Sequence, residues 1–237
     1  MTAAFDLIAL DADDTLWHNE TLYSQAQEKL AGLLAPFLDG EQVVRELFET
    51  EMGNLAYFGY GIKGFALSMI ETAVKVSGGR VGGSEIQQIV DLAKEMQQAP
   101  VHLLEHVEEV IPKLAASHSL MLITKGDLFD QQAKLARSEL APYFENVKVV
   151  AEKTLEMYRM LLEGSGIEPQ RFLMVGNSLR SDILPVVRLG AHAIHIPYHL
   201  TWAHEVVSVE DWEEDGYVEL EHIGLLPEFI QRLEQGG

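Results

Sequence analysis

Three aspartates lie within four positions near the N-terminus, Asp11, Asp13 and Asp14, directly after the apolar residues 7–10. An apolar run of this length that ends abruptly in charge is typical of a buried parallel strand whose C-terminal end opens into a polar loop. In open α/β sheets, ligands bind at that end of the strands. Carboxylates held together there repel one another and lose hydration, so we expect a bound cation or a chemical role for them.

Helix capping is the alternative role for this stretch. Asp13, Asp14 or Thr15 can accept hydrogen bonds from the first amides of a helix that begins near Leu16. The local residues alone leave both roles open.

Composition excludes several classes of partner. The chain has 237 residues, of which 17 are basic and 37 acidic, and its net charge of −20 repels nucleic acid and anionic membranes. The absence of cysteine excludes disulfides and thiolate metal sites. No apolar run is long enough for a signal peptide or a membrane span, so we expect a cytoplasmic protein with a sizeable core.

The order of periodic segments indicates the fold class. Residues 20–98 have apolar side chains at helical spacing, interrupted by glycines. From residue 102 onward, short apolar runs alternate with helical stretches. The predicted strands are residues 120–123, 147–151, 172–175 and 193–196, and the predicted helices are 128–140, 154–164 and 179–189, with a strand near 217–220 and a helix over 227–233 in the tail. Repeated βα units predict an α/β protein with a Rossmann-like parallel sheet covered on both faces.

The helical segment separates the first strand from the second. We therefore predict a core formed by residues 1–17 and 102–237, and an inserted helical cap over 18–101. An insertion at this point rises from the edge of the sheet that carries the aspartates, where a lid would be placed.

Each predicted strand ends in polar residues. Thr124, Lys125 and Gly126 end the second strand, Lys153 follows the third, and Asn177 follows the fourth, with Asp182 shortly after. Parallel strands bring these ends to one edge of the sheet, so they predict one pocket with carboxylates, a hydroxyl, a cation and an amide.

This set of groups suits phosphoryl transfer. The reaction needs an in-line nucleophile, neutralisation of charge on the phosphoryl oxygens and protonation of the leaving oxygen. A carboxylate can attack to form an aspartyl phosphate, and a second carboxylate can protonate the leaving group and later activate water. Mg²⁺ prefers oxygen ligands of this kind. The Thr124 hydroxyl, nearby backbone amides and Lys153 would hold the transferring group.

The residues resemble the four motifs of the haloacid dehalogenase superfamily, most of whose members are Mg²⁺-dependent phosphatases. D-x-D-x-T is matched by Asp11, Asp13 and Thr15, the strand ending in Thr or Ser by Thr124, the lone Lys by Lys153, and the fourth motif by Gly176, Asn177 and Asp182. The resemblance covers nearly the whole chain. It implies Asp11 as nucleophile, Asp13 as acid and base, Thr124 as phosphoryl donor and Lys153 as stabilising cation.

The same resemblance implies a Mg²⁺ site formed by Asp11, the backbone carbonyl of Asp13, Asn177 and Asp182. The family usually has an aspartate where this chain has Asn177, so one negative charge is missing and Asp182 becomes the principal carboxylate ligand expected from this motif. Asn177 also resembles the dehalogenase branch of the superfamily, which works without metal. That branch generally lacks the second aspartate, so Asp13 favours phosphate ester hydrolysis, and Asp14 is left as a turn or capping residue.

Alternatives stay open for individual residues. Thr124 can simply end a strand, Lys153 can lie on the surface, Asn177 can serve a turn, and Asp182 can face solvent. In the predicted cap, residues 58–65 (FGYGIKGF) surround Lys63 with glycines and aromatics, which indicates either a loop that brings Lys63 over an anionic substrate or an ordinary turn between helices.

We therefore expect a Mg²⁺-dependent hydrolase of a small phosphorylated metabolite, with Lys63, Thr124, Lys125 and Gly126 binding the substrate. A 2-haloacid dehalogenase and a non-catalytic binding or regulatory protein are the alternatives. The identity of the phosphate ester, the oligomeric state and the role of the acidic stretch 205–221 are not determined by the sequence.

Overall fold

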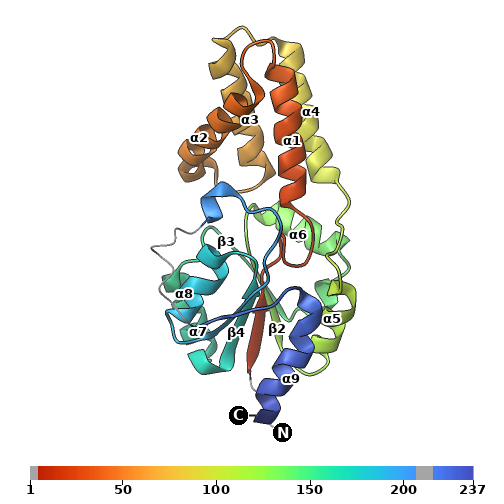
Figure 1. Ribbon diagram of the computed structural model, residues 1–237, viewed down its shortest axis with the longest axis vertical. Coiled ribbons are helices and arrows are strands. Elements are labelled where there is room, and N and C mark those ends of the chain that lie inside the picture. Colours follow the sequence, from red (N-terminus) through yellow and green to blue (C-terminus); the bar gives the residue numbers. More distant parts are fainter. Residues whose placement is uncertain (1–4, 207–215, 237) are drawn as a thin grey trace. The chain divides into compact units, whose positions relative to one another are not determined.

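The computed structural model describes residues 5–206 and 216–236 (Figure 1). The chain divides into two compact units. The core unit comprises Met1–Glu20, Val101–Lys125 and Leu135–Gly237, and the helical unit comprises Thr21–Pro100 and Gly126–Lys134. The segment Gly126–Lys134 thus groups with the helical unit, whereas the sequence placed it in the core with the rest of residues 102–237.

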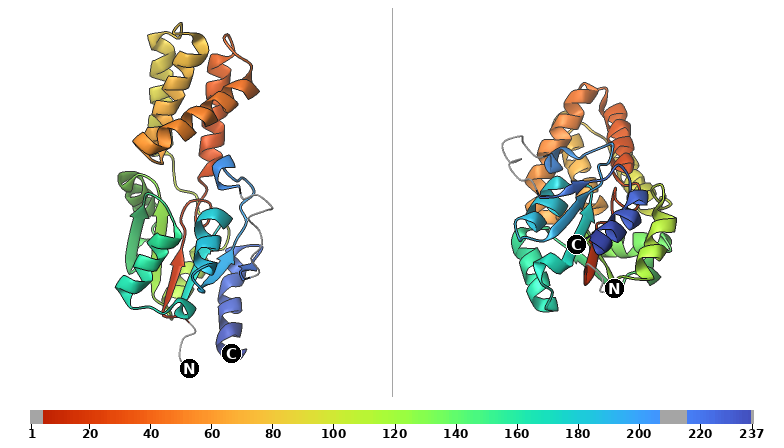
Figure 2. Two further views of the ribbon diagram at one scale, coloured as in Figure 1. Left: turned by 90° about the vertical axis from the view of Figure 1, so that its left-hand side faces the viewer. Right: turned by 60° about the horizontal axis from the view of Figure 1, so that its bottom comes forward.

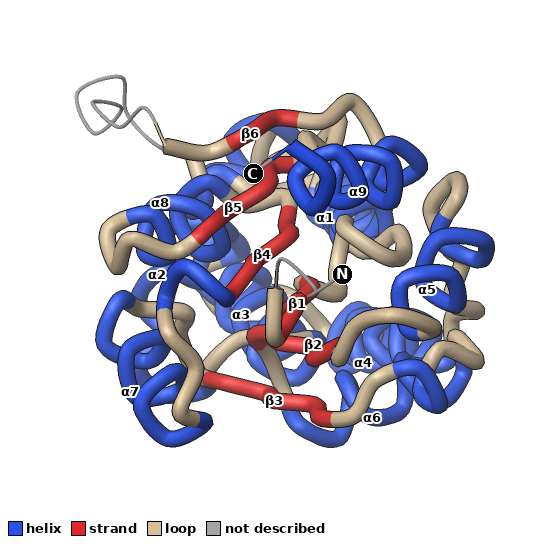
Figure 3. Tube along the Cα trace, turned by 90° about the horizontal axis from the view of Figure 1, so that it is seen from below, coloured by secondary structure: helices blue, strands red, loops and turns tan. Residues whose placement is uncertain are grey.

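The core unit contains a six-stranded parallel sheet with the strand order β3-β2-β1-β4-β5-β6 (Figure 3). The strands are β1 (Leu7–Leu10), β2 (Leu120–Lys125), β3 (Asn146–Val150), β4 (Phe172–Gly176), β5 (His192–His195) and β6 (Val218–Glu219). The predicted α/β fold with a Rossmann-like parallel sheet is confirmed. Because the chain turns to opposite sides of β1 to form β2 and β4, the strand order reverses at β1, and such a point is where open α/β sheets bind ligands.

Strand β1 is central because its side chains are apolar on both faces. Ile8 and Leu10 belong to one apolar cluster, and Leu7 and Ala9 belong to another. This alternation follows from the two-residue period of a strand, and burial on both faces is typical of parallel sheets.

Helices cover both faces of the sheet (Figure 1). Helices α5 (Val107–Ala115) and α9 (Leu226–Gly236) contribute to the cluster that contains Ile8, and α7 (Leu155–Ser165) and α8 (Leu184–Val187) contribute to the other. The helix predicted over 179–189 is instead a π-helical turn, Leu179–Ile183, followed by the short α8.

The helical unit contains most of the sequence between β1 and β2 (orange to yellow in Figure 2). Its helices are α1 (Glu20–Leu34), α2 (Gly40–Phe58), α3 (Ile62–Ser77) and α4 (Gly83–Gln98), while α6 (Leu128–Arg137) begins in this unit. Leu30 of α1, Leu47 of α2 and Met69 of α3 belong to one buried apolar cluster, to which α4 also contributes. Among the described residues, no helix is both long enough and apolar enough to cross a membrane.

Glu51 is a polar exception inside the helical unit. It lies on α2, and its Oε2 atom is buried with no hydrogen-bond partner among the described residues. Burial raises the pKa of Glu51 to about 7, because an ionised carboxylate loses hydration there.

Replacing Glu51 with Gln should make the fold less sensitive to alkaline pH. A folded-state pKa raised above the unfolded value contributes stability that is present at acid pH and is lost as the pH rises through about 7. We expect E51Q to raise the free energy of unfolding by about 1–3 kcal/mol near pH ~8.5 and to change it little near pH ~4. Urea unfolding at both pH values measures this difference. The control is E49Q, an exposed glutamate on the same helix, and an equal gain at both pH values would contradict the prediction.

Candidate active site

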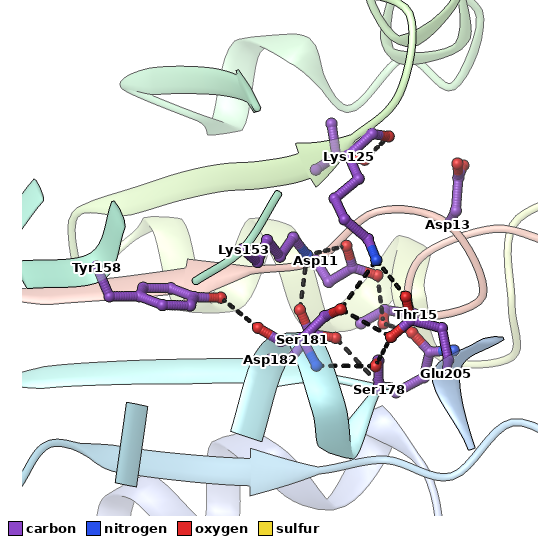
Figure 4. A network of polar contacts seen from close by, with 12 residues as sticks. Asp11, Asp13, Thr15, Lys125, Lys153, Tyr158, Ser178, Ser181, Asp182 and Glu205 are labelled. Atoms are coloured by element: carbon purple, nitrogen blue, oxygen red, sulfur yellow. Dashed lines mark hydrogen bonds and ion pairs between the residues drawn. The ribbon is translucent and has the colours of Figure 1, made fainter. Parts of the chain in front are cut away.

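The strand ends bring the predicted residues together at one edge of the sheet (Figure 4). Leu10 of β1 pairs with Leu122 of β2 and with Val175 of β4, so the residues that follow these positions lie side by side. The Asp11 amide continues this pattern by donating to the Val175 carbonyl at 2.9 Å. The register of the sheet therefore decides which side chains meet.

A buried cluster of three charges forms the centre of the site. Lys153 Nζ donates to Asp11 Oδ1 and, at 2.6 Å, to Asp182 Oδ1. The side chains of Lys153 and Asp182 are only 2% and 1% exposed. Buried charges of this kind persist only when they are paired and hydrogen-bonded, so Lys153 is not a surface residue and Asp182 does not face solvent.

The cluster carries more negative than positive charge. Burial raises the pKa of Asp11 to about 7, although the positive charge of Lys153 acts to lower it. The carboxylates of Asp182 and Asp13 add to the rise. Burial alone would lower the pKa of Lys153, but Asp11 and Asp182 raise it overall, so its ammonium group stays protonated. One further positive charge near Asp11 would stabilise the ionised carboxylates.

Asn177 lies beside Asp11 Oδ2, the carboxylate oxygen that does not bind Lys153. The end of its amide group that faces Asp11 lies 3.2 Å from Asp11 Oδ2 and 3.3 Å from the Asp13 carbonyl oxygen. Thr15 Oγ1 is 3.1 Å from Asp11 Oδ2 and 3.2 Å from the same amide atom. With its nitrogen in this place, Asn177 donates hydrogen bonds to both oxygens, and with its oxygen there, three oxygens converge.

When the Asn177 oxygen is turned toward Asp11, the three oxygens and the unbalanced negative charge fit a small divalent cation. Asp11 Oδ2, the Asp13 carbonyl and the Asn177 amide oxygen are ligands of the type that Mg²⁺ takes. Across residues 5–206 and 216–236, no group of three or more His, Asp or Glu side chains is arranged to hold a metal ion, so a cation here would depend on the backbone and amide oxygens. Both carboxylate oxygens of Asp182 already accept hydrogen bonds, from Lys153 and from the Ser178 amide at 3.0 Å. Its role as a metal ligand stays a prediction.

Asp13 is held by a fully buried tryptophan. Trp17 Nε1 donates to Asp13 Oδ1 at 2.7 Å, and Trp17 is 0% exposed. Because the indole N–H is only a donor, it fixes one carboxylate oxygen of Asp13 as an acceptor.

The capping alternative holds for Asp14. Its carboxylate accepts from the amides of Asn19 and Glu20 at 2.8 and 3.0 Å, at the start of α1. The prediction that Asp14 is a turn or capping residue is confirmed, although the helix begins at Glu20 and not near Leu16. Asp11 and Asp13 have other partners.

The polar end of β2 supplies a hydroxyl and a second cation. Thr124 is buried and its Oγ1 donates to the Lys125 carbonyl at 3.3 Å. Lys125 Nζ donates to Ser181 Oγ at 2.9 Å. Gly126 adopts a φ of +133°, which side chains rarely allow, so glycine is required after Lys125.

Lys63 has its partners inside the helical unit. Its Nζ donates to Asp127 Oδ1 at 2.9 Å and lies 5.4 Å from the centroid of the Phe129 ring. The hydrogen bond from Lys63 holds the pKa of Asp127 below its usual range. The role of Lys63 toward a substrate stays a prediction.

Glu205 is a site residue that the sequence did not reveal. It lies in the 3₁₀ turn Ala203–Glu205, after β5, and it contacts Lys125 Nζ, Ser178 Oγ and, at 2.7 Å, Ser181 Oγ. In the sequence it is one acid in an acidic stretch, with no motif around it. Residues 207–215 of that stretch, which include Trp212, lie outside the described residues.

Two comparisons with known proteins agree with this geometry. A family model described as haloacid dehalogenase-like hydrolase matches residues 5–190. The chain belongs to the haloacid dehalogenase-like hydrolases. A haloacid dehalogenase-like family hydrolase from Xanthomonas campestris is 36% identical and has a TM-score of 0.87. The match covers 98% of this chain and 93% of that hydrolase.

More distant haloacid dehalogenase-like structures show the same fold. The putative HAD-hydrolase YfnB from Bacillus subtilis, described as bound to magnesium, is 16% identical, with a TM-score of 0.68 over 96% of this chain and 99% of its own. A 2-haloacid dehalogenase from Pseudomonas syringae pv. Tomato is 19% identical and has a TM-score of 0.62. The match covers 97% of this chain and 99% of the dehalogenase. No curated protein matches the sequence. These comparisons establish a hydrolase of this family without choosing its reaction.

Removing the central cation should destabilise the core unit. We expect K153M to lower the free energy of unfolding by about 3–5 kcal/mol, because Asp11 and Asp182 are left buried without their counter-charge. K153M combined with D182N should recover part of this loss. Urea unfolding measures both variants, and K29M, which removes an exposed lysine, is the control. A loss in K153M no larger than in K29M would contradict the central role of Lys153.

Proposed function

We propose that this hydrolase cleaves the phosphate monoester of a small metabolite with the help of Mg²⁺, through an aspartyl phosphate on Asp11. The observation that carries the proposal is the pair of differently held carboxylates, Asp11 in the charge cluster and Asp13 on Trp17. We assign attack to the first carboxylate and proton transfer to the second.

The residues divide the reaction between them. Asp11 attacks the phosphorus atom, the bond between phosphorus and the leaving oxygen breaks, and Asp13 gives its proton to that oxygen. Water then attacks the aspartyl phosphate while Asp13 takes up a proton, which releases phosphate and regenerates Asp11. Lys153 and the Thr124 hydroxyl stabilise charge on the transferring group. Mg²⁺, when bound, would neutralise phosphoryl oxygens, and Asp11, the Asp13 carbonyl, Asn177 and Asp182 are its proposed ligands.

A 2-haloacid dehalogenase is the competing reaction, and it would use the same nucleophile. Halide leaves without a proton, so the hydrogen-bonded Asp13 and its buried tryptophan partner would have no task in it. A non-catalytic binding protein is supported only by Asn177, whose missing charge weakens a metal site without removing the nucleophile. The charge of −20 supports a small-molecule partner over nucleic acid or a membrane, and the lack of cysteine supports a cytoplasmic location.

Replacing Asp11 should abolish turnover and leave the fold intact. With p-nitrophenyl phosphate and Mg²⁺, we expect D11N to lose about 10³-fold or more in kcat/KM, since an amide is not a nucleophile here. The control is D6N, which removes an exposed aspartate. Activity retained in D11N would exclude Asp11 as nucleophile.

The wild-type protein distinguishes the alternative functions. Chloride release from 2-chloropropionate would indicate a dehalogenase, and inactivity on both compounds would indicate a binding protein.

Restoring the missing charge should tighten Mg²⁺ binding. We expect N177D to lower the Mg²⁺ dissociation constant by about tenfold, because a carboxylate is a stronger ligand than an amide oxygen. Isothermal titration with Mg²⁺ measures this without any substrate. N146D, an exposed amide at the start of β3, is the matched control. Unchanged or weaker binding in N177D would remove residue 177 from the metal site.

A further inference from the structure

Glu205 holds the second cation of the site. Lys125 and Glu205 form an ion pair in which the two side chains are only 16% and 12% exposed. The Glu205 carboxylate also accepts from Ser178 Oγ and from Ser181 Oγ. An internal carboxylate therefore accepts from all three of these donors.

The partners of Glu205 are the immediate neighbours of the proposed site residues. Lys125 follows Thr124, Ser178 follows Asn177, and Ser181 precedes Asp182. This places the Glu205 carboxylate at the ends of β2 and β4, next to the charge cluster (Figure 4).

The loop that carries Glu205 is anchored next to this contact, and the serines that bind Glu205 are held in turn. Arg180 donates to the carbonyl of His204 at 2.6 Å. The Ser181 amide donates to Ser178 Oγ at 3.0 Å, so the two serines that bind Glu205 also bind each other. Tyr158, buried under the turn, donates to the Ser181 carbonyl at 3.2 Å. These bonds fix the carboxylate in place as part of the site wall.

Glu205 stays ionised over the pH range in which enzymes work. Burial alone would raise its pKa, but the charge of Lys125 and hydrogen bonds from Lys125, Ser178 and Ser181 lower the pKa of Glu205 to about 2. Its negative charge compensates the positive charge of Lys125, and a compensated cation attracts a second anion only weakly.

We propose that Glu205 determines substrate specificity: by neutralising Lys125 it directs the site toward phosphate monoesters whose leaving group carries no second anionic group. The inference rests on the proposed phosphatase function and names its substrate class. An uncompensated lysine and two serine hydroxyls would bind a substrate carboxylate, but the carboxylate of Glu205 already takes these donors. A substrate carboxylate brought to this edge would also be repelled by Glu205, since like charges in a half-buried site are poorly screened.

The test compares two esters that differ in one anionic group. 2-Phosphoglycolate and 2-hydroxyethyl phosphate have nearly the same size, but only the first carries a carboxylate beside the phosphate. Their dissociation constants are measured by isothermal titration with Mg²⁺ present, in a D11N background that prevents turnover. We expect the D11N protein to prefer 2-hydroxyethyl phosphate, and D11N/E205Q to shift the ratio of the two constants by about tenfold toward 2-phosphoglycolate.

Charge variants on both sides of the pair make the test independent of one variant's folding. K125Q should shift the ratio in the opposite direction, because it leaves the Glu205 charge uncompensated. K125Q/E205Q should return the ratio close to its starting value. The matched control is E156Q, which removes an exposed glutamate paired with Arg159 on the surface of α7 and should leave the ratio unchanged.

The outcomes separate this inference from the proposed function. A ratio that changes by less than about twofold in both E205Q and K125Q would mean that the pair only holds the loop, and would overturn the specificity role. Ester binding with the expected shifts, but without hydrolysis by the protein with Asp11 intact, would support the role of Glu205 and reject the phosphatase. Failure of both esters to bind would overturn both.

Discussion

The Lys153 ammonium between Asp11 and Asp182 is the interaction on which the rest of the site depends. Two carboxylates share one cation out of contact with water, and the cluster is short of positive charge by one unit. Burial raises the pKa of Asp11, and the neighbouring carboxylates of Asp182 and Asp13 add to the rise. The surrounding groups matter for the same reason: Thr15 and the Ser178 amide donate further hydrogen bonds to these carboxylates.

The parallel sheet makes this concentration of charge possible. Strand β1 lies between β2 and β4, and the strand order reverses there, so loops from both halves of the core unit open at the same place. The apolar side chains of β1 are buried on both faces and fix the register that sets Asp11 beside the end of β4. Stability from the core thus holds together a cluster that is unfavourable by itself.

Each charge near Asp11 has a distinct partner, and the partners decide its role. Asp14 caps α1, Asp13 is bound by Trp17, Asp182 by Lys153 and the Ser178 amide, and Glu205 by Lys125. The charges of Glu205 and Lys125 cancel each other, whereas the cluster of Asp11, Lys153 and Asp182 keeps a net negative charge. A cation is therefore favoured at Asp11 and an additional anion is disfavoured beside Lys125. Both features belong to one edge of the sheet, and both act against further negative charge there.

The sequence by itself determined the α/β fold class, the positions of the strands and the polar groups that follow them. It could do so because hydrophobic period and strand-end chemistry are local properties. Asp11, Lys153 and Asp182 could be proposed together because parallel strands must bring their ends to one edge. Only the tertiary structure showed that Trp17 holds Asp13, that residues 179–183 form a π-helical turn, and that Glu205 reaches Lys125. These features depend on side-chain packing and on a contact across 80 residues of chain, and neither leaves a pattern in the local sequence.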